Sequence, residues 1–132
     1  IFSIRRSTES EAPPLNLDLS ADRIAVYLSP AVHDRFTSLN SDELLRSTLS
    51  ASVLVPALVL VLEKMMQEEE RESLTDCRWY RTIARKLKDL GLNVENLAES
   101  GESSVVLANK LIGDPLSNSL DDLTQVLQRM ED

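Results

Sequence analysis

The sequence predicts an α+β fold that is mainly α-helical, in which an N-terminal β-hairpin packs on a bundle of four to five helices. Apolar and polar residues alternate over residues 15–29, as in strands that bury one face. Over residues 30–132 the apolar residues instead follow helical spacing. The most apolar segment, near residues 41–66, is expected to form a kinked helix at the centre of the bundle.

The length of the chain, 132 residues, suits one hydrophobic core and is short for two domains. We therefore expect a single domain over 1–132, with an N-terminal segment and linker at 1–14, the hairpin at 15–29 and the helical part at 30–132. Because the sequence begins at Ile1 rather than at Met, we expect this domain to be a module of a larger protein.

The hairpin is predicted from two alternating runs, Leu15–Leu19 and Ile24–Leu28, which flank the turn residues Ser20–Arg23. A two-stranded hairpin is marginally stable in water, so it needs a third strand or a helix on its apolar face. Residues Ile1–Ile4 are apolar enough to supply that strand. Pro13-Pro14 marks the linker between this segment and the hairpin.

The long hydrophobic helix is predicted to follow a shorter helix over Ala31–Leu39, which Pro30 opens. From Asp42 to Met66, leucine, valine and methionine recur at helical spacing. Pro56 lies inside this pattern and is expected to kink the helix, because proline has no amide hydrogen to donate.

The most apolar run of this helix, Leu49–Leu62, contains Ser50, Ser52 and Pro56 and is shorter than the roughly 20 residues that span a bilayer. We therefore expect a buried helix and no membrane association. Between Val53 and Leu62 even the nominal outer face is apolar, so other helices or a second chain must cover it. The interface expected from this excess, together with one aromatic neighbour, comprises Val55, Val59, Leu60, Met65, Met66 and Tyr80.

The C-terminal half is predicted to contain three more helices. Thr75 is expected to cap a helix over Asp76–Leu90 that ends at Gly91 in the left-handed conformation. A shorter helix is expected over residues 103–112. The last helix is expected to begin at Ser119, in a capping box with an acidic residue three positions later. Its apolar face carries Leu120, Leu123, Leu127 and Met130.

The helix predicted over residues 76–90 carries the clearest candidate for ligand binding, a stripe of basic side chains. The basic stripe consists of Arg78, Arg81, Arg85, Lys86 and Lys88. Trp79 and Tyr80 lie on the opposite side, so the helix is expected to dock through its aromatic residues. Aligned cations could bind phosphates or a carboxylate-rich partner. The interpretation that we prefer is pairing with the chain's own acids at residues 68–72, because charged stripes are usually solvated faces.

The net charge of −8, from 22 acidic and 14 basic residues, opposes non-specific binding to nucleic acid or anionic lipid. Any contact with a polyanion must therefore come from a local patch of positive charge, such as the basic stripe.

Few residues suit catalysis or cofactor binding. Cys77 is the only cysteine and His33 the only histidine, which excludes a cysteine-rich zinc site and a histidine pair. Three glycines are too few for a Walker-type or dinucleotide-binding loop. The acids at residues 68–72 suit a solvated helix end better than a metal cage. We expect an inert Cys77 thiol, no catalytic residue, no metal and no cofactor.

The leading hypothesis is a protein–protein interaction or oligomerisation module without catalytic activity, with either another protein or a second copy of itself as partner. The alternative is a module that contacts nucleic acid or phosphate through the basic stripe on helix 76–90. An incomplete piece of an enzyme, with a site assembled from distant residues, is a third hypothesis. A single cysteine is typical of a reducing compartment, so we expect a cytoplasmic location.

Overall fold

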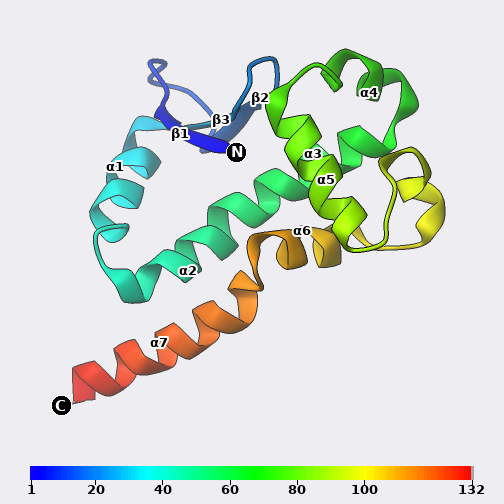
Figure 1. The fold of residues 1–132 in the computed structure, drawn as a ribbon. Coiled ribbons are helices and arrows are strands. Elements are labelled where there is room, and N and C mark those ends of the chain that lie inside the picture. Colours follow the sequence, from blue (N-terminus) through cyan, green and yellow to red (C-terminus); the bar gives the residue numbers. More distant parts are fainter. Residues whose placement is uncertain (132) are drawn as a thin grey trace.

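The N-terminal sheet and the long central helix organise the structure, a computed structural model that describes residues 1–131. The fold is α+β and mainly α-helical, as predicted. Figure 1 shows the sheet above the long helix and the C-terminal helix below it.

The sheet contains three strands, β1 (Phe2–Arg6), β2 (Leu15–Asp18) and β3 (Ile24–Leu28). β3 lies in the middle and pairs antiparallel with β2, with Leu15 opposite Leu28, so the predicted hairpin is confirmed. β1 pairs with β3 in parallel. The N-terminal segment therefore supplies the third strand that the hairpin was expected to need.

The long helix runs from Glu43 to Met66. It comprises a 3₁₀ turn at Glu43–Leu45, α2 at Arg46–Leu49, a π-helical turn at Ser50–Leu54 and α3 at Val55–Met66. In the π-helical turn the amide of Val55 donates to the carbonyl of Ser50, five residues back. This wider turn ends at Leu54, two residues before Pro56, and accommodates a residue that has no amide hydrogen.

The long helix leaves much of its apolar surface incompletely covered. By length and composition alone this helix could cross a membrane, since its most apolar 18 residues have a mean hydropathy of 1.9. Only 22% of that window is buried inside the structure. The buried residues of α3 are Ala57, Leu58, Val61, Leu62 and Met65. Neither α2 nor the π-helical turn contributes a buried residue.

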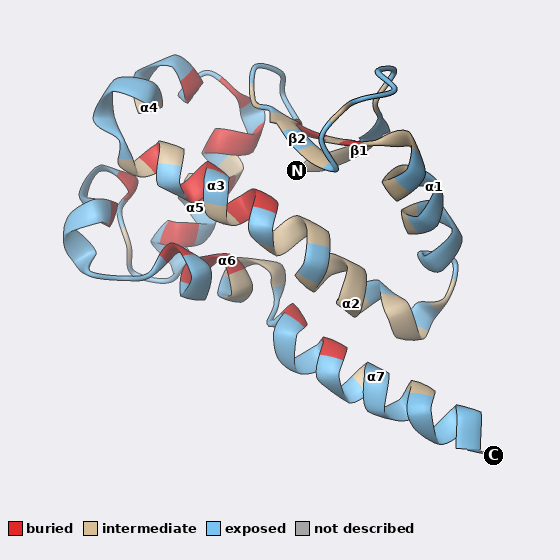
Figure 2. Cartoon of the chain, turned by 180° about the vertical axis from the view of Figure 1, so that it is seen from behind, coloured by how far each residue is buried: buried red, intermediate tan, exposed pale blue. Residues whose placement is uncertain are grey.

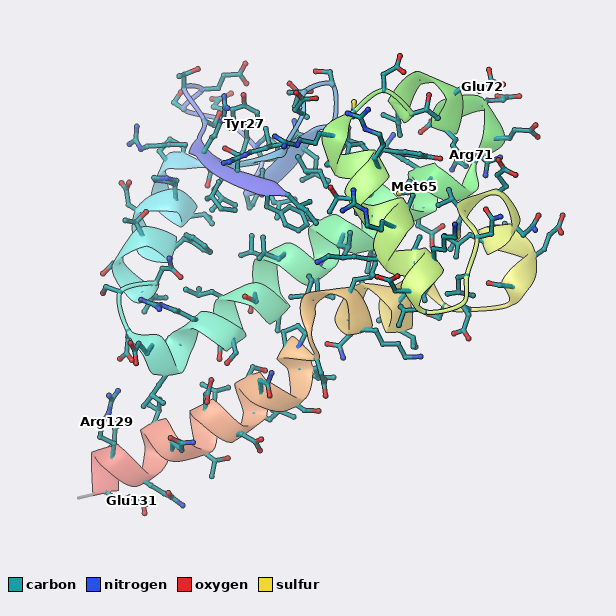
Figure 3. The ribbon with its side chains drawn as sticks, in the orientation of Figure 1. Tyr27, Met65, Arg71, Glu72, Arg129 and Glu131 are labelled. Carbon is teal, nitrogen blue, oxygen red and sulfur yellow. The ribbon has the colours of Figure 1, made fainter. Side chains whose placement is uncertain are left out.

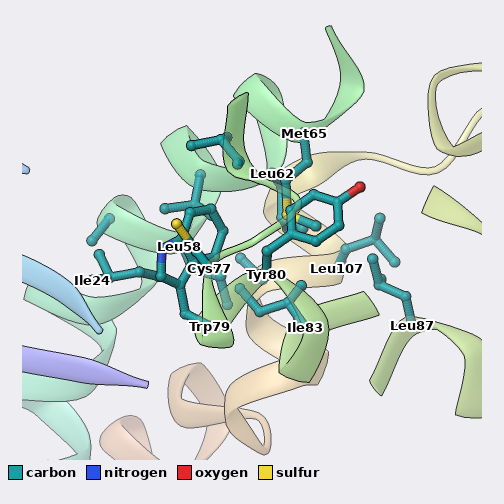
Figure 4. Packing of buried hydrophobic residues seen from close by; sticks show 14 of the residues in the cluster. Ile24, Leu58, Leu62, Met65, Cys77, Trp79, Tyr80, Ile83, Leu87 and Leu107 are labelled. Carbon is teal, nitrogen blue, oxygen red and sulfur yellow. The ribbon is translucent and has the colours of Figure 1, made fainter. Parts of the chain in front are cut away.

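The core forms where α3, β3 and α5 (Arg78–Asp89) meet (Figure 4). Trp79 and Ile83 of α5 are each 1% exposed, and Ile24 of β3 is fully buried. Leu107 closes the core from α6 (Ser104–Ile112). Figure 2 shows the buried residues concentrated around α3 and α5, while most of the C-terminal helix is exposed.

The remaining short elements are α1 (Pro30–Leu39), α4 (Glu68–Leu74) and a 3₁₀ helix at Val94–Ser100. α1 confirms the helix predicted after Pro30. The acidic residues 68–72, expected at a solvated helix end, instead form most of α4.

The predicted cap at Thr75 is wrong, because the Thr75 hydroxyl donates to the Glu72 carbonyl at 3.1 Å, inside the preceding helix. α5 begins at Arg78, with Cys77 at its N-cap. The end of this helix agrees with the sequence, since Gly91 has a φ of 81°.

The last helix, α7 (Pro115–Glu131), begins four residues before the predicted capping box. Ser119 lies inside it, and its hydroxyl donates to the Leu116 carbonyl at 2.8 Å. Proline is favoured at the first helical position, where its missing donor would have no partner, and this preference outweighs the capping-box signal.

Candidate interaction surface

One face of α7 packs beside the first turns of the long helix. Pro115 and Ser119 are its buried residues, and Asp122 and Val126 are half-buried on the same side. The Asp122 carboxylate accepts a hydrogen bond from the Ser47 hydroxyl of α2. α7 thus contacts the body through these residues rather than through its leucines.

A second polar contact lies at the C-terminal end of α7, where Figure 3 labels Arg129. Arg129 Nη2 lies 3.2 Å from Asp42 Oδ2, and the other oxygen of Asp42 accepts from the Leu44 amide at 3.0 Å. The Leu44 amide and the Arg129 guanidinium hold the pKa of Asp42 below its usual value of 3.8. The ionised carboxylate therefore fixes the start of the long helix to the end of α7.

The neighbouring face of α7 is apolar and exposed, and we call it the leucine face. It consists of Leu116, Leu120, Leu123, Leu127 and Met130, with exposed fractions from 37% at Leu123 to 76% at Met130. Their spacing of four, three, four and three keeps them on one side of the helix. Burying a leucine side chain contributes about 1.5–3 kcal/mol, so this orientation forgoes a substantial stabilisation within the single chain.

The turn between α6 and α7 fixes this orientation. Gly113 and Asp114 have φ values of 94° and 58°. Asn109 Nδ2 donates to Asp114 Oδ1 at 2.8 Å, and the same oxygen accepts from the Ser117 amide at 3.3 Å. These hydrogen bonds lower the pKa of Asp114, and the bond from Asn109 has the largest effect. A charged side-chain network therefore sets the direction in which α7 leaves the body.

An apolar groove continues the leucine face onto the body of the molecule. Its volume is about 570 Å³. Leu116 lies in both surfaces, so they form one continuous apolar patch. Val105 and Val106 of α6 are 58% and 45% exposed there. The other lining residues are Ala51, Val55, Asn109, Lys110 and Asp114.

The interface residues predicted on the long helix lie in different environments. Val55 lines the groove, and Leu60 is 45% exposed on the same helix. Val59 and Met66 are half-buried and pack against the core.

Met65 and Tyr80, also predicted at the interface, belong to the core. Met65 is fully buried because it lies on the inner side of α3, and Tyr80 is 9% exposed beside Trp79. Burial raises the pKa of the Tyr80 hydroxyl. The exposed apolar surface therefore lies toward α6 and α7, away from α5.

The basic stripe lies on the outer side of α5, where all five members, Arg78, Arg81, Arg85, Lys86 and Lys88, are exposed. Within residues 1–131 none of the ion pairs involves them. Of the acids at residues 68–72, only Glu70 forms an ion pair, and its partner is Lys64. The preferred pairing of the stripe with these acids is thus absent from this part of the chain.

A shallow pocket of about 520 Å³ adjoins the stripe. Arg85 and Lys88 contribute to its wall together with Tyr80, Asn93 and Glu95. Glu95 places an acid in the same wall, so the pocket is not uniformly basic.

The remaining candidate groups do not form a reactive cluster. Cys77 is 9% exposed, and burial together with Asp22 and Asp76 raises the pKa of its thiol, which favours the inert form. His33 is half-buried beside Asp34 on α1, with Nδ1 3.6 Å from the carboxylate. In the described chain, residues 1–131, no three histidine, cysteine or acidic residues are grouped so as to hold a metal.

The interface predicted from the sequence omits the leucine face, including Leu116. It also omits Val105 and Val106 of the groove. The signal for the leucine face was present in the four-three spacing of the last helix. Such a stripe normally predicts a buried face, so sequence alone does not reveal that this one is turned outward.

Comparison of the chain with protein-family models, curated proteins and solved structures finds no match, so any function has to be inferred from these surfaces.

Proposed function

We propose that the chain is a protein–protein assembly module without catalytic activity, and that its contact surface is the leucine face of α7 together with the adjoining groove. One observation carries the proposal: α7 packs on the body through residues other than its leucines and leaves those leucines exposed. Continuous apolar patches of this kind are typical of interaction sites.

The poor coverage of the long helix supports the same proposal. Only 22% of its most apolar window is buried, and Val55 from this helix lines the groove. A partner seated on the groove and on the leucine face would cover apolar surface from α3, α6 and α7 together. The proposed interface is therefore broader than a single helix.

The test replaces Leu120 and Leu127 together by glutamine, which keeps helix propensity but removes the apolar face. The matched control is Leu39→Gln, at a leucine of α1 that is 45% exposed outside this surface. We expect the wild-type protein to form a complex in sedimentation velocity, either with itself or with a co-purified partner. The double variant should lose that complex, and the control should keep it.

Circular dichroism must show that the double variant retains its helices. The proposal is wrong if wild-type protein sediments only as a 14.8 kDa monomer and co-purifies with no partner. It is equally wrong if the double variant assembles as well as the wild type does.

The basic stripe supports a second candidate function, contact with a polyanion such as nucleic acid. The supporting observation is that the five exposed cations form no ion pair within residues 1–131. The probe is a labelled single-stranded oligonucleotide, titrated at about 50 mM and about 200 mM salt. We expect binding that weakens with salt, that is lost in Arg81→Glu/Arg85→Glu, and that is kept in Arg35→Glu. Absence of binding at the lower salt concentration would eliminate this candidate.

A further inference from the structure

We infer that the leucine face of α7 binds a second copy of this chain, and that the two α7 helices pair in an antiparallel arrangement. This inference rests on the proposed function and names the partner and its orientation.

The spacing of the leucine face is that of a coiled-coil seam. Leu120 and Leu127 occupy one type of core position, and Leu116, Leu123 and Met130 occupy the other. In a coiled coil the positions beside the seam decide whether two identical helices attract or repel. Here those positions are Ser117, Ser119, Thr124, Val126 and Glu131, of which only Glu131 is charged. Two copies can therefore approach with little repulsion along the seam.

The position of Glu131 distinguishes the two orientations. In a parallel pair each Glu131 would lie beside the uncharged Val126 of the other copy, at the negative C-terminal ends of both helices. In an antiparallel pair each Glu131 would instead meet the first turn of the other α7, which contains no acidic residue and carries the positive end of the helix dipole. Charge complementarity therefore favours the antiparallel pair.

The groove adds a second charge of the right sign at that end. Lys110 lines it and forms no ion pair within residues 1–131. The carboxylate of Asp114 also lines the groove and stays negatively charged while it accepts from Asn109 and the Ser117 amide, so the attraction for Glu131 comes from Lys110. Lys110 is thus the available partner for the incoming Glu131.

The groove also provides an apolar site for the end of the second helix. Met130 is 76% exposed at one end of the leucine face, and Leu116 lies at the other end beside Val105 and Val106. In an antiparallel pair the core positions of one type face those of the other type, so Leu116 lies opposite Leu127 and Leu120 opposite Leu123. Met130 of each copy then extends beyond Leu116 to the groove of the other. An α7 of 17 residues is about 25 Å long and is short for an isolated coiled coil. The two groove contacts extend the interface beyond the seam.

The test measures disulfide formation between singly substituted proteins in a Cys77→Ala background. Leu116→Cys and Leu127→Cys are prepared separately, with tags of different mass, and mixed under oxidising glutathione. We expect the mixed 116–127 disulfide to form faster than either homodisulfide, because a parallel pair would instead join identical positions. Leu120→Cys and Leu123→Cys should form a mixed disulfide in the same way, and Leu39→Cys, which lies outside the surface, should not crosslink. Circular dichroism confirms that each variant is folded.

A charge exchange tests the role of Lys110 independently. We expect Lys110→Glu and Glu131→Lys each to weaken self-association roughly two- to fivefold, although the second makes the chain less acidic, and Lys110→Glu/Glu131→Lys to restore it. A lack of restoration would overturn the charge argument for the antiparallel pair.

The outcomes separate this inference from the proposed function. Predominant 116–116 and 127–127 disulfides would overturn the antiparallel pair while leaving assembly through the leucine face intact. A monomeric chain that binds a different protein through the leucine face would overturn the second copy as partner, again without affecting the proposed function. A monomer that forms no disulfide and binds no protein through this face would overturn both.

Discussion

At the scale of single residues, Trp79 connects the helical core to the hairpin. Its ring is 1% exposed and packs at the N-terminal end of α5 (Figure 4). Its indole Nε1 donates to the carbonyl of Leu19 at 3.1 Å, and its own amide donates to the carbonyl of Asp22 at 3.1 Å. The same residue therefore fills the core and satisfies backbone groups of the turn between β2 and β3.

We expect Trp79→Ala to lower the free energy of unfolding by about 3–5 kcal/mol, because it leaves a large cavity. Trp79→Phe replaces the bicyclic indole by a smaller phenyl ring and also removes the bond to Leu19, so a loss of at least about 1–2 kcal/mol is expected. Urea unfolding followed by circular dichroism measures both values. Tyr80→Phe is the control, with a change within about 0.5 kcal/mol. A Trp79→Phe protein as stable as wild type would show that the bond to Leu19 contributes nothing.

At the scale of secondary-structure elements, the turn before α7 determines which face of that helix is exposed. Gly113 has a φ of 94°, and a Cβ built on it would meet no atom within 4 Å. Gly101, before α6, has a φ of 77° and equally open surroundings. The two glycines thus impose the same backbone requirement at different joints of the chain.

Gly113→Ala and Gly101→Ala should each lower the free energy of unfolding by about 1–2 kcal/mol, because only the backbone conformation is penalised. Gly113→Ala alone should increase hydrogen exchange at the α7 amides and weaken assembly, since only this joint orients the leucine face. Equal effects of both variants on α7 exchange would show that the joint does not position the helix.

The contact between α7 and the long helix should depend on pH through Asp42. Its pKa is lowered in the folded chain, so its carboxylate contributes stability that is fully present above the unfolded value near 3.8. That contribution is lost as the pH falls through the lower folded pKa. We expect the stability difference between wild type and Asp42→Asn to be constant from about pH 7 to pH 5 and to shrink below about pH 4. Thermal unfolding at dilute protein concentration measures it, and a difference unchanged at low pH would exclude this role for the carboxylate.

At the scale of the whole molecule, the sequence was sufficient for the elements that depend on local patterns. Alternation predicted β2 and β3, helical spacing predicted the long helix, and Gly91 marked the end of α5. The predicted start of α7 was wrong because proline and the capping box gave competing local signals. The exposure of the leucine face was not predictable, because it depends on contacts such as Ser47–Asp122 and Arg129–Asp42, which join residues far apart in the sequence.

The net charge of the whole molecule should make self-association depend on salt concentration. Two copies that each carry a charge of −8 repel at long range, whereas burial of the leucine face is insensitive to screening. We therefore expect self-association to tighten as salt rises from about 50 mM to about 200 mM, as measured by sedimentation equilibrium, and to tighten more steeply in Lys110→Glu, which is more acidic. Binding of a polyanion to the basic stripe must weaken over the same range, because phosphate contacts are lost to counterions. Self-association that weakened with salt would mean that attraction between charges, rather than burial of leucines, holds the two copies together.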